Sequence, residues 1–192
     1  MSTALTTFPE LLILRHGETE WNVKGLMQGA TDSPLTAKGV RQAQDQAKIL
    51  ARLDFTGFQV LSSPQGRALR TAQIALGGQG HDIQIDNRLR EIGVGDVIGQ
   101  DRKVLAELHA GPHFLSYYDA LPGGEGFQAL YGRCYDLLSM LNGPSVLVCH
   151  GVTSRMLRVV ALGLDISDVA TVPGGQGNVH QIKDGTARVL TV

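Results

Sequence analysis

The sequence is poor in net charge, in cysteine and in long apolar runs, and each scarcity excludes a class of protein. A formal net charge of -1 at pH 7 gives no basic surface for nucleic acid or an anionic membrane. Two cysteines are too few for a disulfide framework. No apolar run approaches the length of a membrane span. We therefore expect no nucleic-acid partner and no membrane partner.

The chain also lacks the signals of secretion and of nucleotide cofactors. Its first ten residues, MSTALTTFPE, have neither the basic segment nor the apolar core of a secretory signal, so we expect a cytoplasmic location. Cys134 and Cys149 fall in a helical and a strand pattern, which predicts buried, reduced thiols. The glycine-rich stretches match neither Gly-x-x-x-x-Gly-Lys-Ser/Thr nor Gly-x-Gly-x-x-Gly between a strand and a helix, so no cofactor is predicted.

What is present is an alternation of apolar runs with amphipathic stretches over 192 residues, 43% of them hydrophobic. This pattern predicts a single domain over 1–192 of the α/β class: a three-layer αβα sandwich around a mostly parallel sheet. A cap-like segment at about 96–124 is expected over the cleft, and a hairpin around Asp184-Gly185 near the end. Strands are predicted at 11–14, 58–61, 83–85 and 146–149, and helices at 36–52, 64–76, 101–110, 125–141 and 152–162, with a loop over 17–34.

Two strands are followed directly by the dipeptide His-Gly. The first, Leu11 to Leu14, leads into Arg15, His16 and Gly17, and the second, 146–149, leads into His150 and Gly151. Ligands of open α/β sheets bind beyond the carboxyl ends of the strands. If the strands are neighbours, both imidazoles face one crevice.

The two histidines admit three interpretations. A metal site needs further converging ligands, and the permanently cationic Arg15 beside His16 opposes one, so no metal is predicted. Two buried histidines without a chemical role remain an alternative. The functional interpretation is an imidazole nucleophile that attacks phosphorus while Arg and a second His stabilise the charge on oxygen. Cys149 precedes His150 on its strand and should point to the opposite face.

Six short blocks along the chain, in this order, resemble the histidine phosphatase superfamily, which includes the cofactor-dependent phosphoglycerate mutases. They are Arg15-His16-Gly17-Glu18-Thr19 with Asn22, Ser33-Pro34-Leu35-Thr36 with Gly39 and Gln42, Ser62-Ser63-Pro64 with Arg67, Ala68, Thr71 and Ala72, Leu89 with Glu91, Pro122-Gly123-Gly124-Glu125, and His150-Gly151.

The resemblance implies roles for the matching residues. His16 would be the phosphorylated nucleophile and Glu91 the proton donor. His150 would complete the catalytic group, and the phosphate would be bound by Arg15, Asn22, Arg67 and Gly151. The chain departs from the family pattern at Val97-Ile98, where Trp-Glu is frequent, and at Gly126, where Ser is frequent.

The function predicted from the resemblance is metal-independent hydrolysis of a small phosphomonoester through a phosphohistidine. A phosphoglycerate mutase and a non-catalytic phosphate-binding protein are the alternatives, and a homodimer is left open. A mutase must hold a bisphosphate, and 96–124 offers only Arg102 and Lys103 against Asp96, Asp101, Glu107 and Asp119, which favours the phosphatase. Aromatic and histidine side chains there, or nearby, could line the cleft or pack the cap: Trp21, His109, His113, Tyr117 and Tyr118.

Overall fold

A six-stranded sheet forms the centre of the computed structural model, which describes residues 8–77, 80–108 and 111–192. The strand order is β3-β2-β4-β1-β5-β6. The four strands from β3 to β1 are parallel, and β5 and β6 are antiparallel to their neighbours. The strands are β1 (Leu11–Arg15), β2 (Gln59–Ser62), β3 (Ile83–Ile85), β4 (Ser145–Cys149), β5 (Val179–Lys183) and β6 (Thr186–Leu190).

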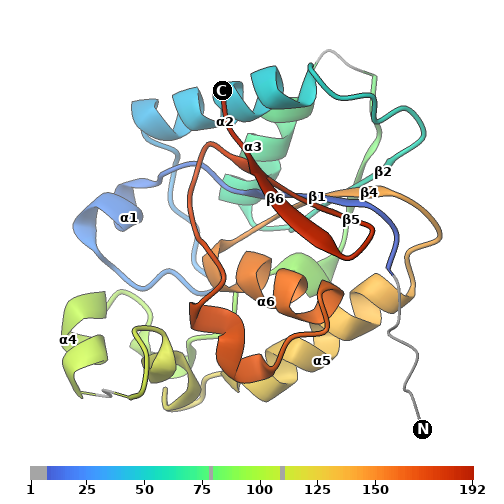
Figure 1. Ribbon diagram of the computed structural model, residues 1–192. Coiled ribbons are helices and arrows are strands. Elements are labelled where there is room, and N and C mark those ends of the chain that lie inside the picture. The colour runs from blue at the N-terminus through green and yellow to red at the C-terminus, as the bar shows by residue number, and fades with distance from the viewer. Residues whose placement is uncertain (1–7, 78–79, 109–110) are drawn as a thin grey trace, which may run out of the picture.

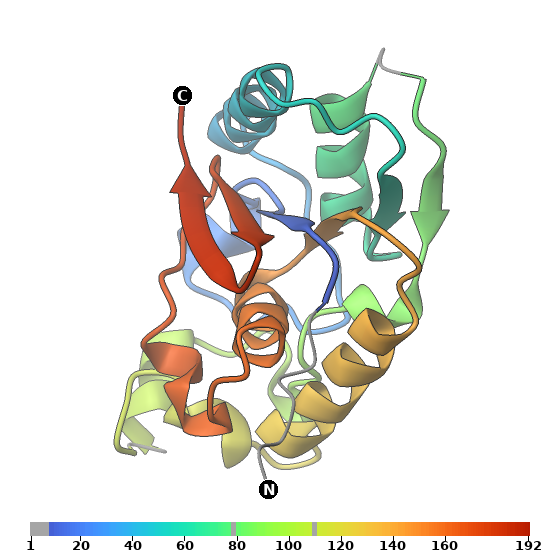
Figure 2. The same ribbon diagram turned by 45° about the vertical axis from the view of Figure 1, so that its right-hand side comes forward.

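Helices cover both faces of this sheet, as Figures 1 and 2 show. One face carries α2 (Ala37–Leu50) and α3 (Gly66–Leu76), and the other carries α5 (Gly126–Ser139) and α6 (Gly151–Ala161). Successive side chains of a strand point to opposite faces, so Leu12 and Leu14 pack in one apolar cluster and Leu11 and Ile13 in the other. The predicted three-layer αβα architecture is confirmed.

Local signals explain where the main elements begin and end. Thr36 caps α2, since its hydroxyl accepts a hydrogen bond from Gly39 N at 3.0 Å. The residues that α2 and α3 bury recur at helical spacing, as expected of amphipathic helices. Asp184 and Gly185 both have positive φ (49° and 70°), as a tight two-residue hairpin requires.

The structure differs from the sequence prediction in the stretch 17–34, which holds a short helix, α1 (Glu20–Lys24). Thr19 and Asn22 form a capping box around its first turn, but α1 buries no residue. A five-residue helix without an apolar face carries no periodic signal, which is why a loop was predicted.

Gly126, the first residue of α5, is one of the two places where the chain departs from the family pattern. It has φ of 72°, a conformation that a serine at this position would adopt only with strain.

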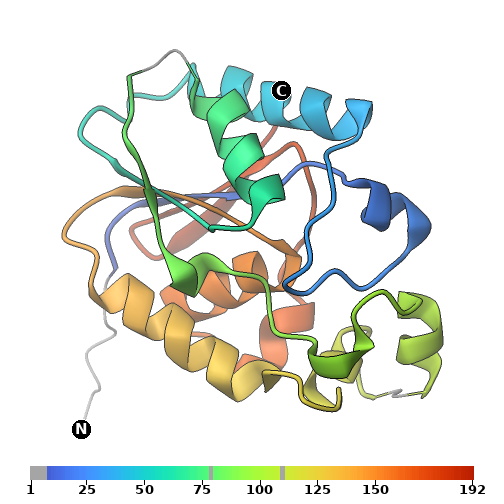
Figure 3. The same ribbon diagram turned by 180° about the vertical axis from the view of Figure 1, so that it is seen from behind.

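The described parts of the stretch between β3 and α5 run past the carboxyl ends of the parallel strands (Figure 3). They hold α4 (Arg102–Leu108) and three short 3-10 helices, Asn87–Leu89, Gly95–Val97 and Ser116–Asp119. A fourth 3-10 helix, Ile166–Ala170, follows α6. The helix predicted for 101–110 corresponds to α4, and its last two predicted residues, including His109, lie outside the described residues, as do residues 1–7. No helix within the described ranges is long and apolar enough to cross a membrane.

Candidate active site

The pairing of β1 with β4 brings the two histidines together. Arg15 lies opposite Cys149 in this parallel pair, and His16 N donates a hydrogen bond to Cys149 O at 3.0 Å. The residue that follows each strand therefore enters the same space. The ring centroids of His16 and His150 are 5.2 Å apart, and both side chains are buried. The strands are thus the neighbours that a shared crevice requires.

One nitrogen of His16 is held by the backbone. Nδ1 lies 2.7 Å from Gly17 O, and a carbonyl can only accept, so Nδ1 carries the proton and Nε2 keeps its lone pair. Burial, followed by the charges of Arg15 and Arg67, holds the pKa of His16 well below its ordinary value. The ring is therefore neutral at physiological pH, with Nε2 as a free nucleophile.

His150 is held from the opposite side by a serine. Its Nε2 lies 2.8 Å from Ser63 Oγ, at the end of β2, and its Nδ1 is buried with no hydrogen-bond partner among the described residues. Burial is the largest cause that lowers the pKa of His150, and the charge of Arg67 comes next. Ser63 belongs to a sequence block quoted above, but only the structure reveals its contact with the imidazole.

Arg67 is almost fully buried in the first turn of α3. Its NH1 donates to Thr31 O at 3.0 Å and to Asp32 Oδ1 at 3.1 Å, and its NH2 donates to Gly29 O at 3.0 Å. From the sequence, Asp32 is expected only to structure its loop or to be solvated. The structure shows that the Asp32 carboxylate also accepts from Arg67 N, so it fixes both the helix end and the guanidinium.

Two arginines and a histidine each keep one buried nitrogen without a hydrogen-bond partner in the part of the chain that the structure describes. These atoms are Arg15 Nε, Arg67 Nε and His150 Nδ1. Buried polar groups are nearly always hydrogen-bonded, and both arginine nitrogens carry a proton to donate. Arg15 and Arg67 both line one pocket, and an unpartnered N–H on a permanent cation is suited to the oxygen of an anion.

Gly151 makes room for the guanidinium of Arg15. A Cβ atom at Gly151, the first residue of α6, would lie 3.2 Å from Arg15 Cζ, which is tighter than nine in ten real contacts. The absence of a side chain lets the guanidinium pack against the start of α6. The position of Arg15 therefore depends on glycine at 151.

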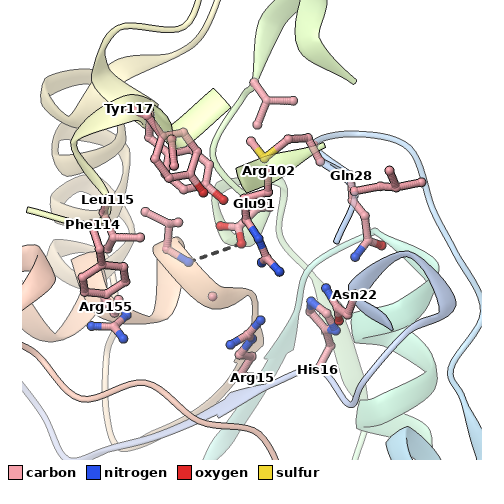
Figure 4. Close-up of a pocket in the computed structure, with 18 of the residues that line it drawn as sticks. Arg15, His16, Asn22, Gln28, Glu91, Arg102, Phe114, Leu115, Tyr117 and Arg155 are labelled. Atoms are coloured by element: carbon pink, nitrogen blue, oxygen red, sulfur yellow. Dashed lines mark hydrogen bonds between the residues drawn. The ribbon is translucent and has the colours of Figure 1, made fainter. Parts of the chain in front are cut away.

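Glu91 is bound to the first turn of α6 through both carboxylate oxygens. Oε1 accepts from Ile92 N and from Thr153 N, each at 3.0 Å, and Oε2 accepts from Val152 N at 3.2 Å. The last of these bonds is the dashed line in Figure 4. Oε2, with a single long contact, is the oxygen better able to exchange a proton. Gln65 completes the support, since its Oε1 accepts from Glu91 N at 2.8 Å.

Asn22 lies beside His16 in Figure 4. Its Oδ1 accepts from Thr19 N at 3.2 Å and from Gln176 Nε2 at 3.4 Å, so only its Nδ2 end remains to donate to a ligand. Gln176 Nε2 also lies 3.0 Å from His16 O. Gln176 therefore links the backbone of His16 to α1, a contact that the sequence did not indicate.

These residues line one pocket of about 400 Å³. All the predicted site residues except His150 are on its surface. The expectation that both imidazoles face one crevice therefore holds for His16 but not for His150. Figure 4 shows His16 and Asn22 on one side and Phe114 and Arg155 on the other. The lining residues are Arg15, His16, Asn22, Leu26, Met27, Gln28, Gly29, Arg67, Glu91, Val94, Arg102, Lys103, Ala106, Phe114, Leu115, Tyr117, Tyr118, Gly151, Val152 and Arg155.

Only some of the side chains that the sequence suggested for the cleft line the pocket. Tyr117 and Tyr118 line the pocket and stack with centroids 4.4 Å apart, whereas Trp21 and His113 do not line it. The Cys149 thiol is fully buried away from the pocket, and burial raises its pKa far above the ordinary value. Arg155 was missed by the sequence analysis, although its spacing of four from Gly151 places it one helical turn into α6.

The charge of the pocket corrects an expectation drawn from the segment 96–124. Both of its basic residues, Arg102 and Lys103, line the pocket, and none of its acidic residues does. Counting charges along the segment was therefore wrong as a guide to the pocket, because Arg102 and Lys103 of α4 line it while Glu107 of the same helix does not. Within the described ranges, no group of three or more His, Cys, Asp or Glu side chains could hold a metal ion.

The comparison with protein families agrees with this geometry. The model described as "Histidine phosphatase superfamily (branch 1)" matches residues 11–190, nearly the whole chain. The chain belongs to this superfamily. A curated relative, the "probable phosphoglycerate mutase GpmB" of Salmonella choleraesuis (strain SC-B67), is 37% identical over 164 residues, which are 81% of this chain and 75% of the relative.

Solved structures of other superfamily members share the fold. The α-ribazole phosphatase from Shigella flexneri has a TM-score of 0.78 at 30% identity, over 95% of this chain and 96% of its own. The mycobacterial glucosyl-3-phosphoglycerate phosphatase in complex with VO3 has a TM-score of 0.79 at 28% identity, over 96% of both chains.

The two neutral histidines make stability depend on pH. Their folded-state pKa values lie below the unfolded value of about 6.5, so the unfolded chain binds protons more readily and stability is lost as pH falls below about 6.5. We expect the free energy of unfolding to fall between pH 6.5 and 5 by up to about 2 kcal/mol for each histidine. Urea denaturation at several pH values tests this.

Inorganic phosphate and a variant serve as controls for that measurement. Phosphate should offset part of the loss, and His16→Asn should make the pH dependence shallower. His180, whose pKa burial lowers to about 4, contributes in the same direction and remains in the variant. A stability that is constant or that rises from pH 6.5 to 5 contradicts the assignment of neutral rings.

Proposed function

We propose that this protein hydrolyses a small phosphomonoester through a phosphohistidine at His16. The observation that carries the proposal is the hydrogen bond of 2.7 Å from His16 Nδ1 to Gly17 O. It leaves Nε2 unprotonated beside Arg15 and Arg67. A protein that only binds phosphate needs the two arginines but has no use for an oriented, neutral imidazole together with a carboxyl group.

In the first step, Nε2 of His16 attacks phosphorus in line and the bond from phosphorus to the leaving oxygen breaks. In this mechanism Arg15 Nε, Arg67 Nε and Asn22 Nδ2 donate to the phosphoryl oxygens. His150 Nδ1 adds a further donor in the tautomer in which Ser63 Oγ donates to Nε2 of the ring. Protonated Glu91 gives its proton to the leaving oxygen. In the second step, the Glu91 carboxylate takes a proton from water, the water oxygen bonds to phosphorus, and the bond to Nε2 breaks.

The names of the similar proteins divide between two activities. The compared structures are phosphatases that match nearly the full length of both chains. These neighbours support hydrolysis of a small metabolite. The curated relative carries a mutase name, and the cations Arg102 and Lys103 in the pocket favour that second candidate, since a mutase must hold a bisphosphate intermediate.

Phosphorus NMR separates the two activities. The protein is incubated with 3-phosphoglycerate and catalytic 2,3-bisphosphoglycerate, and separately with a panel of phosphomonoesters, all in the presence of a chelator. We expect inorganic phosphate from some monoester without interconversion of the phosphoglycerates. Side chains supply all the charge stabilisation in this mechanism, so chelation should not reduce the rate. Efficient interconversion with little free phosphate refutes hydrolysis, and activity that only a divalent metal restores refutes this mechanism.

A further inference from the structure

The pocket is larger than the phosphate site within it. A volume of about 400 Å³ lies in the range of sites that enclose whole small-molecule ligands. The wall opposite His16 is formed by Phe114, Leu115 and the stacked pair Tyr117 and Tyr118. This space and its apolar wall fit a leaving alcohol of substantial size with a flat or apolar part.

The same pocket holds more positive charge than one phosphate needs. Arg102, Lys103 and Arg155 line it, and none has a carboxylate within 4.0 Å in the described part of the chain. Glu91 is the one acidic residue among the lining residues. In the proposed mechanism Arg15 and Arg67 bind the phosphate, so Arg102, Lys103 and Arg155 remain available to bind a second anionic group.

The charges of these cations act on one another. Burial is the main cause that lowers the pKa of Arg155 and of Arg15, but the charge of Arg15 adds to it for Arg155, and the charge of Arg102 adds to it for Arg15. The charge of Arg15 therefore interacts with those of Arg102 and Arg155, and the carboxylate of Glu91 offsets part of the repulsion at Arg15. A ligand with more than one anionic group relieves this repulsion.

Arg102 and Arg155 are also held in place. Arg102 N donates to Gly25 O at 2.9 Å, so the start of α4 is fastened to the loop after α1. Arg155 NH1 donates to Val172 O, and its guanidinium lies over the ring of Phe114, 5.3 Å from the centroid. Phe114 lines the pocket and is 62% exposed, so its ring is accessible to a ligand there.

Resting on the proposed phosphatase activity, we propose that Arg102, Lys103 and Arg155 form a subsite for a second acidic group on the leaving alcohol. The substrate class is then a phosphomonoester whose alcohol carries a carboxylate or a further phosphate, separated from the reacting phosphate by an apolar or aromatic part. Phe114 and Tyr117 cover that middle part. In this proposal the segment 96–124 is a cap whose side chains bind the leaving group and so determine which substrates are accepted.

Matched probes test the subsite. The pair is para-carboxybenzyl phosphate and its methyl ester, which differ in one charge and little else, and a third probe carries a phosphate in place of the carboxylate. We expect kcat/KM to be about tenfold higher or more for the acid than for the methyl ester, as for a hydrogen-bonded charge. The third probe tells whether the subsite prefers a carboxylate or a second phosphate.

Variants assign the preference to the proposed residues. In the double variant Arg102→Gln with Lys103→Gln, and separately in Arg155→Gln, the ratio of acid to methyl ester should fall toward one. The double variant alters only polar side chains of α4, which is anchored by buried Leu105, so it keeps the test valid if Arg155→Gln does not fold. The matched control is Arg70→Gln, an exposed arginine on α3 outside the pocket, which should leave the ratio unchanged.

Calorimetry with the corresponding non-hydrolysable phosphonates separates this inference from the proposed function. Equal affinities of the wild-type protein for the acid and the methyl ester overturn the subsite, even if both phosphates are hydrolysed. A preference that survives in every folded variant overturns the assignment to these cations. Preference for the acid in binding without turnover of any phosphate supports the subsite and refutes the phosphatase instead.

Discussion

Replacement of His16 by alanine should lower turnover by about 10⁴-fold or more, because the reaction then has no atom to accept the phosphoryl group. His16 lies just beyond β1, and its ring makes no hydrogen bond to a distant part of the described chain. The fold should therefore persist. Binding of inorganic phosphate should persist as well, since Arg15 and Arg67 remain. Steady-state kinetics and equilibrium dialysis measure the two properties.

The phosphoenzyme itself gives the sharper test of His16. Rapid quenching of the wild-type protein with labelled substrate should trap an acid-labile phosphate, and the His16→Ala variant should trap none. His81→Ala is the matched control, because His81 stacks on Phe55 and does not line the pocket. Near-normal turnover of the His16→Ala variant, or a wild-type protein without a trapped phosphate, rules out the nucleophile.

Glu91→Gln should slow the hydrolysis of alkyl phosphates by about 10²- to 10⁴-fold, the usual contribution of a general acid. The amide keeps the shape of the side chain and an oxygen that can accept from Thr153 N, but it has no proton to give. A nitrophenyl phosphate should lose far less, because its leaving phenolate is stable without a proton. The ratio of the two losses is therefore the quantity to measure.

A second carboxylate serves as the control for Glu91. Glu107→Gln alters an exposed residue of α4 that does not line the pocket, and it should leave both rates unchanged. Similar losses for alkyl and aryl phosphates in Glu91→Gln point instead to a positioning role for Glu91 through its contacts with the first turn of α6.

The sequence determined the layers of the fold and the position of two histidines at the ends of central strands. Apolar runs of four or five residues, with amphipathic helices between them, specify buried parallel strands covered on both faces. The dipeptide His-Gly after two of these runs placed His16 and His150 at strand ends. These signals are local, since burial periodicity and strand length are properties of neighbouring residues. For the same reason α1, which buries nothing, left no trace in the pattern.

The tertiary structure decided everything that depends on residues far apart in the chain. It paired β1 with β4, brought Asp32 to Arg67 and Ser63 to His150, and set Glu91 at the first turn of α6. It also decided the charge of the pocket. The direction in which a loop or a short helix presents its side chains depends on packing against distant elements, so the inward placement of cations from α4 could be known only from the folded chain.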